Sequence, residues 1–448
     1  MKRRAAILAW ILGMTCLVWL PSRAAQAAGF TYSDQEYSQL ADASSPDTIP
    51  PGTKITVDNW QQYKKFMPLS LQAAFRGDYS FHLSNDPQYT LVVAPTTPLP
   101  PPRQYVADSE KYGSQTQLVP APTGGFTMKN WIAGAPFPNP SEPNKGVKLL
   151  YDAWCTFRPF NYHNFSVGYL VDRFGNKSAN DSDAQFFNLS HLSEPGLPIN
   201  MPYANGNFYV SRFIVTAPEQ SKYTTELQMQ PDDPMKHPET YVFLPSLRRS
   251  LRLSSAARCS PINGTDWVQD DNAWNPPNYI VKFLGQKKIL VNIQDRDMSK
   301  SLTPKAYVGI TEANAGTMPG WPKAGTGHWE LRTTDIIDAR WIPSLGSYCF
   351  THRIHYVDHE NWVTTLLEEY DNSEKLWKSS WNKLLPLKID GQETLFLDAY
   401  AVAWDVDWQN GHLTAGSMYD PKFNKEITGE YADVQGLSQP SSLARVMK

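Results

Sequence analysis

Residues 340–379, RWIPSLGSYCFTHRIHYVDHENWVTTLLEEYDNSEKLWKS, contain the pattern that decides the fold. A run of strand-forming residues ends at Tyr356 and is followed by the polar stretch 358–361. A second run ends at Tyr370, and the polar stretch 371–374 separates it from a third. Short strands joined by polar turns are typical of an antiparallel meander. The segment therefore predicts an antiparallel sheet, either a sandwich or an open barrel.

The same pattern extends over residues 146–423 and predicts one antiparallel β domain there. An irregular region with short helices, 28–145, precedes it and is expected to pack with it as a single domain. The tail 424–448 is polar, and we expect it to be loosely held. Aromatic residues make up 12% of the chain, which favours strands over long helices. The candidate strands are 147–157, 165–173, 207–216, 222–229, 239–253, 278–284, 287–294, 329–341, 349–358, 362–370, 374–382 and 395–405.

The N-terminus has the pattern of a secretory signal peptide. Basic residues at 2–4 precede an apolar run at 5–20, and Ala25 and Ala27 then occupy the two small-residue positions of a cleavage site. Residues 1–27 are therefore predicted to be removed on export. The mature protein is expected in the periplasm of a Gram-negative cell, either free or associated with the outer membrane.

Charge and cysteine content exclude several classes of protein. The formal net charge is -3 and no block of like charge stands out, so a nucleic-acid partner is not expected. After signal-peptide removal, the cysteines are Cys155, Cys259 and Cys349. Three cysteines allow at most one intramolecular bridge, and the sequence leaves open which pair would form it.

The sequence contains none of the common catalytic motifs, such as a G-x-S-x-G elbow, an H-E-x-x-H helix or a phosphate-binding loop. His352, His355 and His359 come closest to a metal-binding pattern. On a strand, however, His352 and His355 point to opposite faces, and His355 and His359 stand about 13 Å apart. We therefore predict neither an enzyme nor a metal or cofactor site.

The segment 58–76, DNWQQYKKFMPLSLQAAFR, predicts one or two short helices with a break at Pro68. Its large apolar residues recur mostly at helical spacing, so one face should pack on the sheet. We expect this face to form a lid over an apolar ligand; the alternative is that it fills the barrel as core. The residues are Trp60, Phe66, Met67, Leu71 and Phe75.

A basic stretch follows a bend that Pro245 should impose within the candidate strand 239–253. Its arginines could meet a ligand head group or an acidic partner. Alternatively, acids downstream could neutralise them in an ordinary salt-bridged surface. The arginines are Arg248, Arg249 and Arg252, and the acids are Asp266, Asp270 and Asp271.

Five stretches of the sequence resemble an envelope family called "domain of unknown function 1329". The resemblance rests on YVFLPSLRRSLRLS at 241–254, NGTDWVQDD at 263–271, IPPGTKITVDNWQQYKKFMP at 49–68, GAPFPNPSEPNKGVKLLYDAW at 134–154 and the meander at 340–379. The first two are also similar to the strand pair of LolA/LolB-type lipoprotein carriers. The resemblance implies a mainly β fold with a few helices, a half-open antiparallel barrel whose N-terminal region acts as its lid.

The resemblance implies a function in carrying apolar molecules. We expect a monomeric periplasmic carrier for a lipid, a lipoprotein or another hydrophobic ligand, linked to outer-membrane or envelope export. One alternative is an accessory protein without a ligand that docks on an envelope transporter of the resistance-nodulation-division type. A second is an enzyme that acts on lipids or esters.

Overall fold

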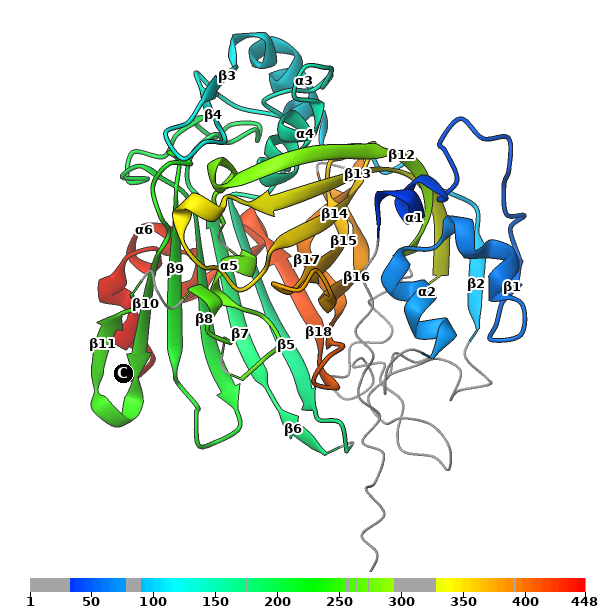
Figure 1. Cartoon of the computed structure of the whole chain (residues 1–448). Helices are drawn as coiled ribbons and strands as arrows, with labels where there is room; N and C mark the ends of the chain where they lie inside the picture. The colour runs from blue at the N-terminus through cyan, green and yellow to red at the C-terminus, as the bar shows by residue number, and fades with distance from the viewer. Residues whose placement is uncertain are drawn as a thin grey trace, which may run out of the picture.

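The computed structural model describes residues 33–77, 90–174, 176–254, 258–262, 264–272, 274–293, 328–389 and 392–447 (Figure 1). The predicted signal peptide, 1–27, lies outside these residues. Among the helices that are described, none has both the length and the apolar character needed to cross a membrane.

A sheet of sixteen strands dominates the described part of the chain. Its order is β1-β2-β13-β14-β15-β16-β17-β18-β5-β7-β8-β9-β10-β11, with β12 paired to β13 and β16, and β6 paired to β5. Neighbours are antiparallel except for β2 with β13 and β12 with β16. The strands are β1 (Lys54–Ile55), β2 (Leu91–Ala94), β5 (Asn161–Val171), β6 (Lys177–Ala179), β7 (Asp181–Asn188), β8 (Asn207–Ala217), β9 (Thr225–Pro231), β10 (Glu239–Leu244), β11 (Arg249–Arg252), β12 (Tyr279–Ile293), β13 (His328–Trp341), β14 (His352–Asp358), β15 (Thr364–Tyr370), β16 (Leu376–Ile389), β17 (Gln392–Asp407) and β18 (His412–Phe423).

The sheet curves but does not close, because β1 and β11 remain as its two edges among the described strands. Figure 1 shows it bending around the short helix α5 (Gln269–Asn272), with β5 to β11 on one side and β12 to β16 on the other. The prediction of a mainly β, half-open antiparallel barrel is confirmed.

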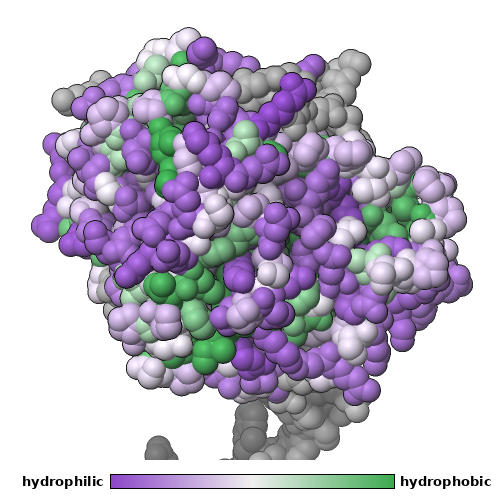
Figure 2. Space-filling model, turned by 90° about the horizontal axis from the view of Figure 1, so that it is seen from above, coloured by the Kyte–Doolittle hydropathy of each residue, from purple (hydrophilic) through white to green (hydrophobic). Residues whose placement is uncertain are grey.

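Helical segments cover the sheet near both edges and at one end (Figure 1). The N-terminal segments are α1 (Asp34–Ser38), η1 (Trp60–Phe66) and α2 (Leu69–Arg76), and the C-terminal ones are α6 (Val434–Leu437) and η12 (Pro440–Met447). At the upper end lie α3 (Arg103–Tyr112), α4 (Lys145–Trp154) and the pair β3 (Gln117–Pro120) and β4 (Phe126–Lys129). Seen from this end, the surface is mainly hydrophilic, with separate small hydrophobic patches (Figure 2).

The meander at 340–379 forms β14, β15 and the start of β16, as predicted. Alternation along these strands produces two different faces. On β14, Ile354 and Tyr356 belong to the core that includes the N-terminal segments, whereas Val357 belongs to a second core on the opposite face. The sheet is therefore buried on both sides along this stretch, and each side packs against different segments of the chain.

The predicted strand at 147–157 is wrong: residues Lys145–Trp154 form helix α4. Apolar residues occur at every second position of this segment, which is typical of a strand, but their spacing is also compatible with a helix. The helix is buried on two sides: Val147 and Tyr151 pack in a cluster with β3–β4 and β8, and Leu150 packs against β12 to β14. Burial on two sides removes the one-sided pattern that distinguishes the two structures.

The candidate strand 239–253 is two strands, β10 and β11, joined by the turn η4 (Pro245–Leu247). The bend expected at Pro245 is therefore confirmed, and β11 forms one edge of the sheet. Arg248 completes the turn with a positive φ of 50°.

One disulfide bridge joins Cys259 to Cys349, and Cys155 is a buried free thiol. The bridge ties the connection between β11 and β12 to the residues that precede β14, 90 positions away in the sequence. The pairing that the sequence left open is thus decided by which segments the sheet brings together.

The expectation of a loosely held tail after residue 423 is wrong. Val434, Leu437 and Leu443 are buried in a core with Leu227 of β9 and Phe243 of β10. Polar residues dominate this segment, but a few apolar side chains at the right spacing are enough to fasten it to the sheet.

Candidate ligand-binding site

The segment of η1 and α2, residues 60–76, is called the N-terminal cover below. Pro68 separates its two helices, and Gly77, with a φ of 79°, ends the second. All the apolar residues predicted to form the lid lie in one core with strand residues of β12 to β18. Their exposed fractions are 6% for Trp60, 3% for Phe66, 0% for Met67, 1% for Leu71 and 3% for Phe75.

An apolar cavity of about 20 Å³ lies between α2 and the sheet. Leu71 lines it on the cover side, and Val291, Leu366 and Trp381 are among the strand residues opposite. This volume holds on the order of one water molecule, whereas pockets for small-molecule ligands occupy roughly 300–1,000 Å³. An acyl chain could therefore enter here only if the cover moved away from the sheet.

One residue that lines this apolar site has a buried polar atom without a hydrogen-bond partner among the described residues. Asn292 of β12 lines the cavity, is 7% exposed, and its side-chain oxygen Oδ1 is buried and accepts no hydrogen bond. A buried acceptor without a donor costs about 1–3 kcal/mol. A ligand with a hydroxyl or amide near its apolar chain would supply that donor.

Glu368 of β15 holds the cover to the sheet through a buried hydrogen-bond network. Its Oε1 accepts a bond of 2.6 Å from the backbone N–H of Ser70 in α2. Its Oε2 accepts bonds from three tyrosine hydroxyls, at 3.1 Å from Tyr37 of α1, 3.2 Å from Tyr356 and 3.1 Å from Tyr370. The indole of Trp381 also donates to the Ser70 hydroxyl at 3.0 Å. The same carboxyl therefore contacts two N-terminal helices and two strands.

Burial raises the pKa of the Glu368 carboxyl above its usual value, although the hydrogen bonds from Ser70, Tyr370 and Tyr37 oppose this shift. The pKa of Tyr37 is also raised, chiefly by burial and then by the neighbouring Tyr370 and Glu368. The Glu368 carboxyl therefore lies buried between the cover and the sheet, and its hydrogen bonds join the two.

The opposite face of the same strands carries buried charged residues beside its apolar core. Arg353 of β14 is 2% exposed and pairs with Asp271 at 2.7 Å and with Glu369 at 2.8 Å. Burial raises the pKa of Glu369 to about 8 and that of Asp405 on β17 to about 8. Because successive residues point to opposite faces of a strand, the neighbours Glu368 and Glu369 lie on different sides of the sheet.

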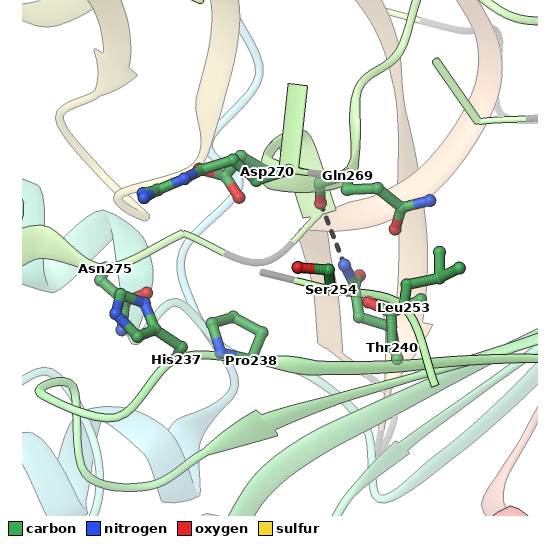
Figure 3. Close-up of a pocket in the computed structure, with 10 residues that line it drawn as sticks. His237, Pro238, Thr240, Leu253, Ser254, Gln269, Asp270 and Asn275 are labelled. Atoms are coloured by element: carbon green, nitrogen blue, oxygen red, sulfur yellow. Dashed lines mark hydrogen bonds between the residues drawn. The ribbon is translucent and has the colours of Figure 1, made fainter. Parts of the chain in front are cut away.

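A polar pocket of about 40 Å³ opens beside this charged layer (Figure 3). The Gln228 amide donates to the backbone carbonyl of Gln269 at 3.0 Å, the bond drawn in Figure 3. The side-chain oxygens of both glutamines are buried and have no hydrogen-bond partner in the part of the chain that the structure describes. Burial raises the pKa of Asp270, which also lines the pocket, to about 6. This volume and lining suit water or one small polar group, not an acyl chain.

The arginines and acids that were predicted as one surface are not brought together. Arg252 pairs with Glu239 at 2.6 Å, and Arg248 and Arg249 are exposed on the β10–β11 hairpin. Asp271 pairs with Arg353 as described above. Asp266 accepts a bond of 2.7 Å from the hydroxyl of Thr414, and Asp270 lines the polar pocket.

Two of the three histidines of the meander pair with neighbouring carboxylates. His352 lies 2.8 Å from Asp338, and His359 lies 2.7 Å from Asp335. Burial lowers the pKa of His355 to about 3.

Sequence reasoning missed the Glu368 network. The pair Glu368–Glu369 was visible as adjacent acids on a strand, but the partner Tyr37 is 331 positions away. No local spacing could indicate that contact, because it depends on how the N-terminal helices lie on the sheet.

Comparison with known proteins identifies the family. The family model described as "Protein of unknown function (DUF1329)" matches residues 54–435. The chain belongs to this family. No curated protein matches the sequence.

Similar solved structures come from three bacteria. A DUF1329 family protein from Desulfovibrio piger is 12% identical with a TM-score of 0.47, and the match covers 68% of this chain and 100% of that one. A putative outer membrane lipoprotein-sorting protein domain from Vibrio parahaemolyticus is 12% identical with a TM-score of 0.45, covering 66% and 99%. A LolA superfamily protein from Nitrosomonas europaea is 14% identical with a TM-score of 0.36, covering 62% and 94%.

Proposed function

We propose that this DUF1329 protein is a periplasmic binding protein that carries a lipid, a lipoprotein acyl chain or another hydrophobic molecule between its N-terminal cover and its sheet. The observation that carries the proposal is the apolar cavity between Leu71 of the cover and the strand residues beneath it. In this closed state the cavity is small, so binding requires the cover to lift.

Two features support a cover that moves as a unit. Its side chains of Trp60, Phe66 and Met67 are large and apolar, and methionine and aromatic rings adapt to ligands of varied shape. Part of its polar attachment passes through the Glu368 carboxyl, which accepts a hydrogen bond from Ser70 of the cover and another from Tyr37 of the neighbouring α1, and the Trp381 indole donates to the Ser70 hydroxyl. Releasing a small number of contacts at that point would free the apolar face for a ligand.

Changing the size of Leu71 tests the proposal. Leu71→Trp should fill the cavity and reduce binding of a fluorescent fatty acid, whereas Leu71→Ala should enlarge it and preserve or increase binding. Leu150→Ala in α4 is the matched control, because Leu150 is equally buried but lies in a different core. Each Ala variant should lose about 2–5 kcal/mol of stability. If wild-type protein binds no apolar probe, or if all three variants bind equally, the proposal fails.

Phe66→Asp distinguishes a lid from a permanent part of the core. In a lid, the new charge should weaken probe uptake while costing little stability, since the cover can lift to expose it. In a permanent core, the buried charge should cost several kcal/mol and lower the melting temperature sharply.

A second candidate function is an accessory protein that docks on an envelope transporter without a ligand of its own. The small volumes of the two cavities, about 40 and 20 Å³, favour it. Native mass spectrometry of protein purified from its own periplasm separates the two: a co-purified lipid supports the carrier. Sequencing the N-terminus of that material also tests export, because cleavage should remove residues 1–27.

A further inference from the structure

Three hairpin turns lie along one end of the half-barrel. Strands β5, β8 and β10 run in the same direction, since each is separated from the next by one antiparallel neighbour, β7 or β9. The turns that follow them therefore emerge at the same end of the sheet, the lower end in Figure 1. Strands in a sheet are about 4.8 Å apart, so alternate strands such as β5 and β8 lie roughly 10 Å apart across the sheet. The turn after β5 also reaches farther along the strand direction than the turn after β8, because β5 continues to Val171 beyond Ser166, the residue level with Val215 of β8.

Each of these turns exposes one large hydrophobic side chain. Phe174, after β5, is 82% exposed; Tyr223, after β8, is 42% exposed; and Leu247, after β10, is 54% exposed. Among the described residues, the other exposed large hydrophobics are Val92 and Ile280, on β2 and β12. Single exposed hydrophobics are common on protein surfaces, but three of the five exposed large hydrophobics among the described residues lie on turns at this one end of the sheet.

Basic side chains accompany the row. Arg173 and Lys177 are exposed on either side of Phe174, and Arg248 and Arg249 are exposed beside Leu247. Lys222 lies over the ring of Tyr223, at 5.3 Å from its centroid, and pairs with Glu219. The acids on these turns are Asp172 and Glu219, so cations outnumber them.

The geometry points to a membrane-docking edge: we propose that Phe174, Tyr223 and Leu247, here called the hairpin edge, insert into the surface of a bilayer that contains anionic phospholipid. Apolar side chains at the tips would enter the boundary between head groups and acyl chains, while the arginines and lysines beside them bind lipid phosphates. The open sheet would then stand on the membrane by this end. The proposal does not depend on whether the N-terminal cover binds a ligand.

Vesicle co-sedimentation tests the hairpin edge with full-length mature protein. Wild-type protein should bind vesicles of phosphatidylcholine mixed with phosphatidylglycerol, and binding should weaken in high salt and on pure phosphatidylcholine. The variant Arg248→Glu/Arg249→Glu should bind at least tenfold more weakly at low salt, because each basic group near an anionic surface contributes a factor of about five. Phe174→Ser/Leu247→Ser should weaken binding by roughly tenfold through lost insertion.

The matched control is Ile280→Ser, which removes an equally exposed hydrophobic residue outside the hairpin edge. It should bind vesicles like wild type, and all variants should keep the wild-type melting temperature because the changed side chains are exposed. The proposal is overturned if wild-type protein binds neither vesicle, if it binds both equally, or if the edge variants bind as well as Ile280→Ser. Uptake of a soluble apolar probe should be unchanged in the edge variants, so the result is independent of the carrier function.

Discussion

Replacing Glu368 should loosen the N-terminal cover, because this one carboxyl accepts hydrogen bonds from Ser70, Tyr37, Tyr356 and Tyr370. In Glu368→Leu these donors lose their acceptor. A buried donor left unpaired costs about 1–3 kcal/mol, but without Glu368 one of the Tyr37 and Tyr370 hydroxyls, which lie 2.8 Å apart, can donate to the other. We therefore expect a loss of about 3–5 kcal/mol in the free energy of unfolding.

Glu368→Gln is the matched control, since its amide has nearly the same shape. The amide oxygen can accept from Ser70, and the amide nitrogen can donate to the tyrosine hydroxyls, which rotate to accept. Its loss of stability should be about 1 kcal/mol or less. The glutamine also cannot ionise, so this variant separates the contribution of the hydrogen bonds to stability from the contribution of the charge.

The pH dependence of these variants follows from the raised pKa of Glu368. The folded protein holds this proton at pH values where the unfolded chain, with a pKa of about 4.3, has lost it. The contribution of Glu368 to stability is therefore fully present below that value and is lost as pH rises through the folded-state pKa. This loss should be absent in Glu368→Gln.

Two measurements check the prediction. Urea unfolding across pH gives the free energies, and hydrogen exchange of the backbone amides of Leu69–Arg76 reports whether the cover opens. Exchange in α2 should be faster in Glu368→Leu than in Glu368→Gln, and uptake of an apolar probe should accelerate with it. If Glu368→Leu unfolds like wild type and α2 exchanges at the same rate, Glu368 does not hold the cover.

Two further predictions concern the charged face and the disulfide. Asp405 has a folded-state pKa of about 8, so its contribution to stability is present below its unfolded pKa of about 3.9 and is lost as pH rises through about 8. In Asp405→Asn, urea unfolding should show a pH-dependent loss of stability that is smaller by up to roughly 5 kcal/mol. Equal pH profiles for the variant and the wild type would refute this prediction. Replacing both Cys259 and Cys349 by Ala removes a bridge between residues 90 positions apart. Calorimetry should show a loss of about 3–5 kcal/mol in the free energy of unfolding. Cys155→Ala is the control and should not reproduce this loss if the bridge itself is responsible.

Local patterns predicted most strands but misjudged where some of them divide. The candidates 278–284 and 287–294 are one strand, β12, whose pairing with β13 shifts at Gly285. A glycine inside a strand pattern indicates either a turn or a bulge, and only the partner strand decides between them. The strands β7 and β18 were not predicted, because polar residues interrupt their patterns and pairing with β5 stabilises both of them.

The sequence by itself determined the antiparallel meander, the bend at Pro245, and an apolar N-terminal segment interrupted at Pro68. These features depend on alternation, helical spacing and the restricted backbone of proline, all of which act between close neighbours. Tertiary structure alone decided that α4 is a helix, that Cys259 pairs with Cys349, and that Glu368 meets Tyr37. It also decided which hairpin turns share one end of the sheet. Those contacts join residues far apart in the chain, and their partners are selected by strand order and burial, which no local pattern encodes.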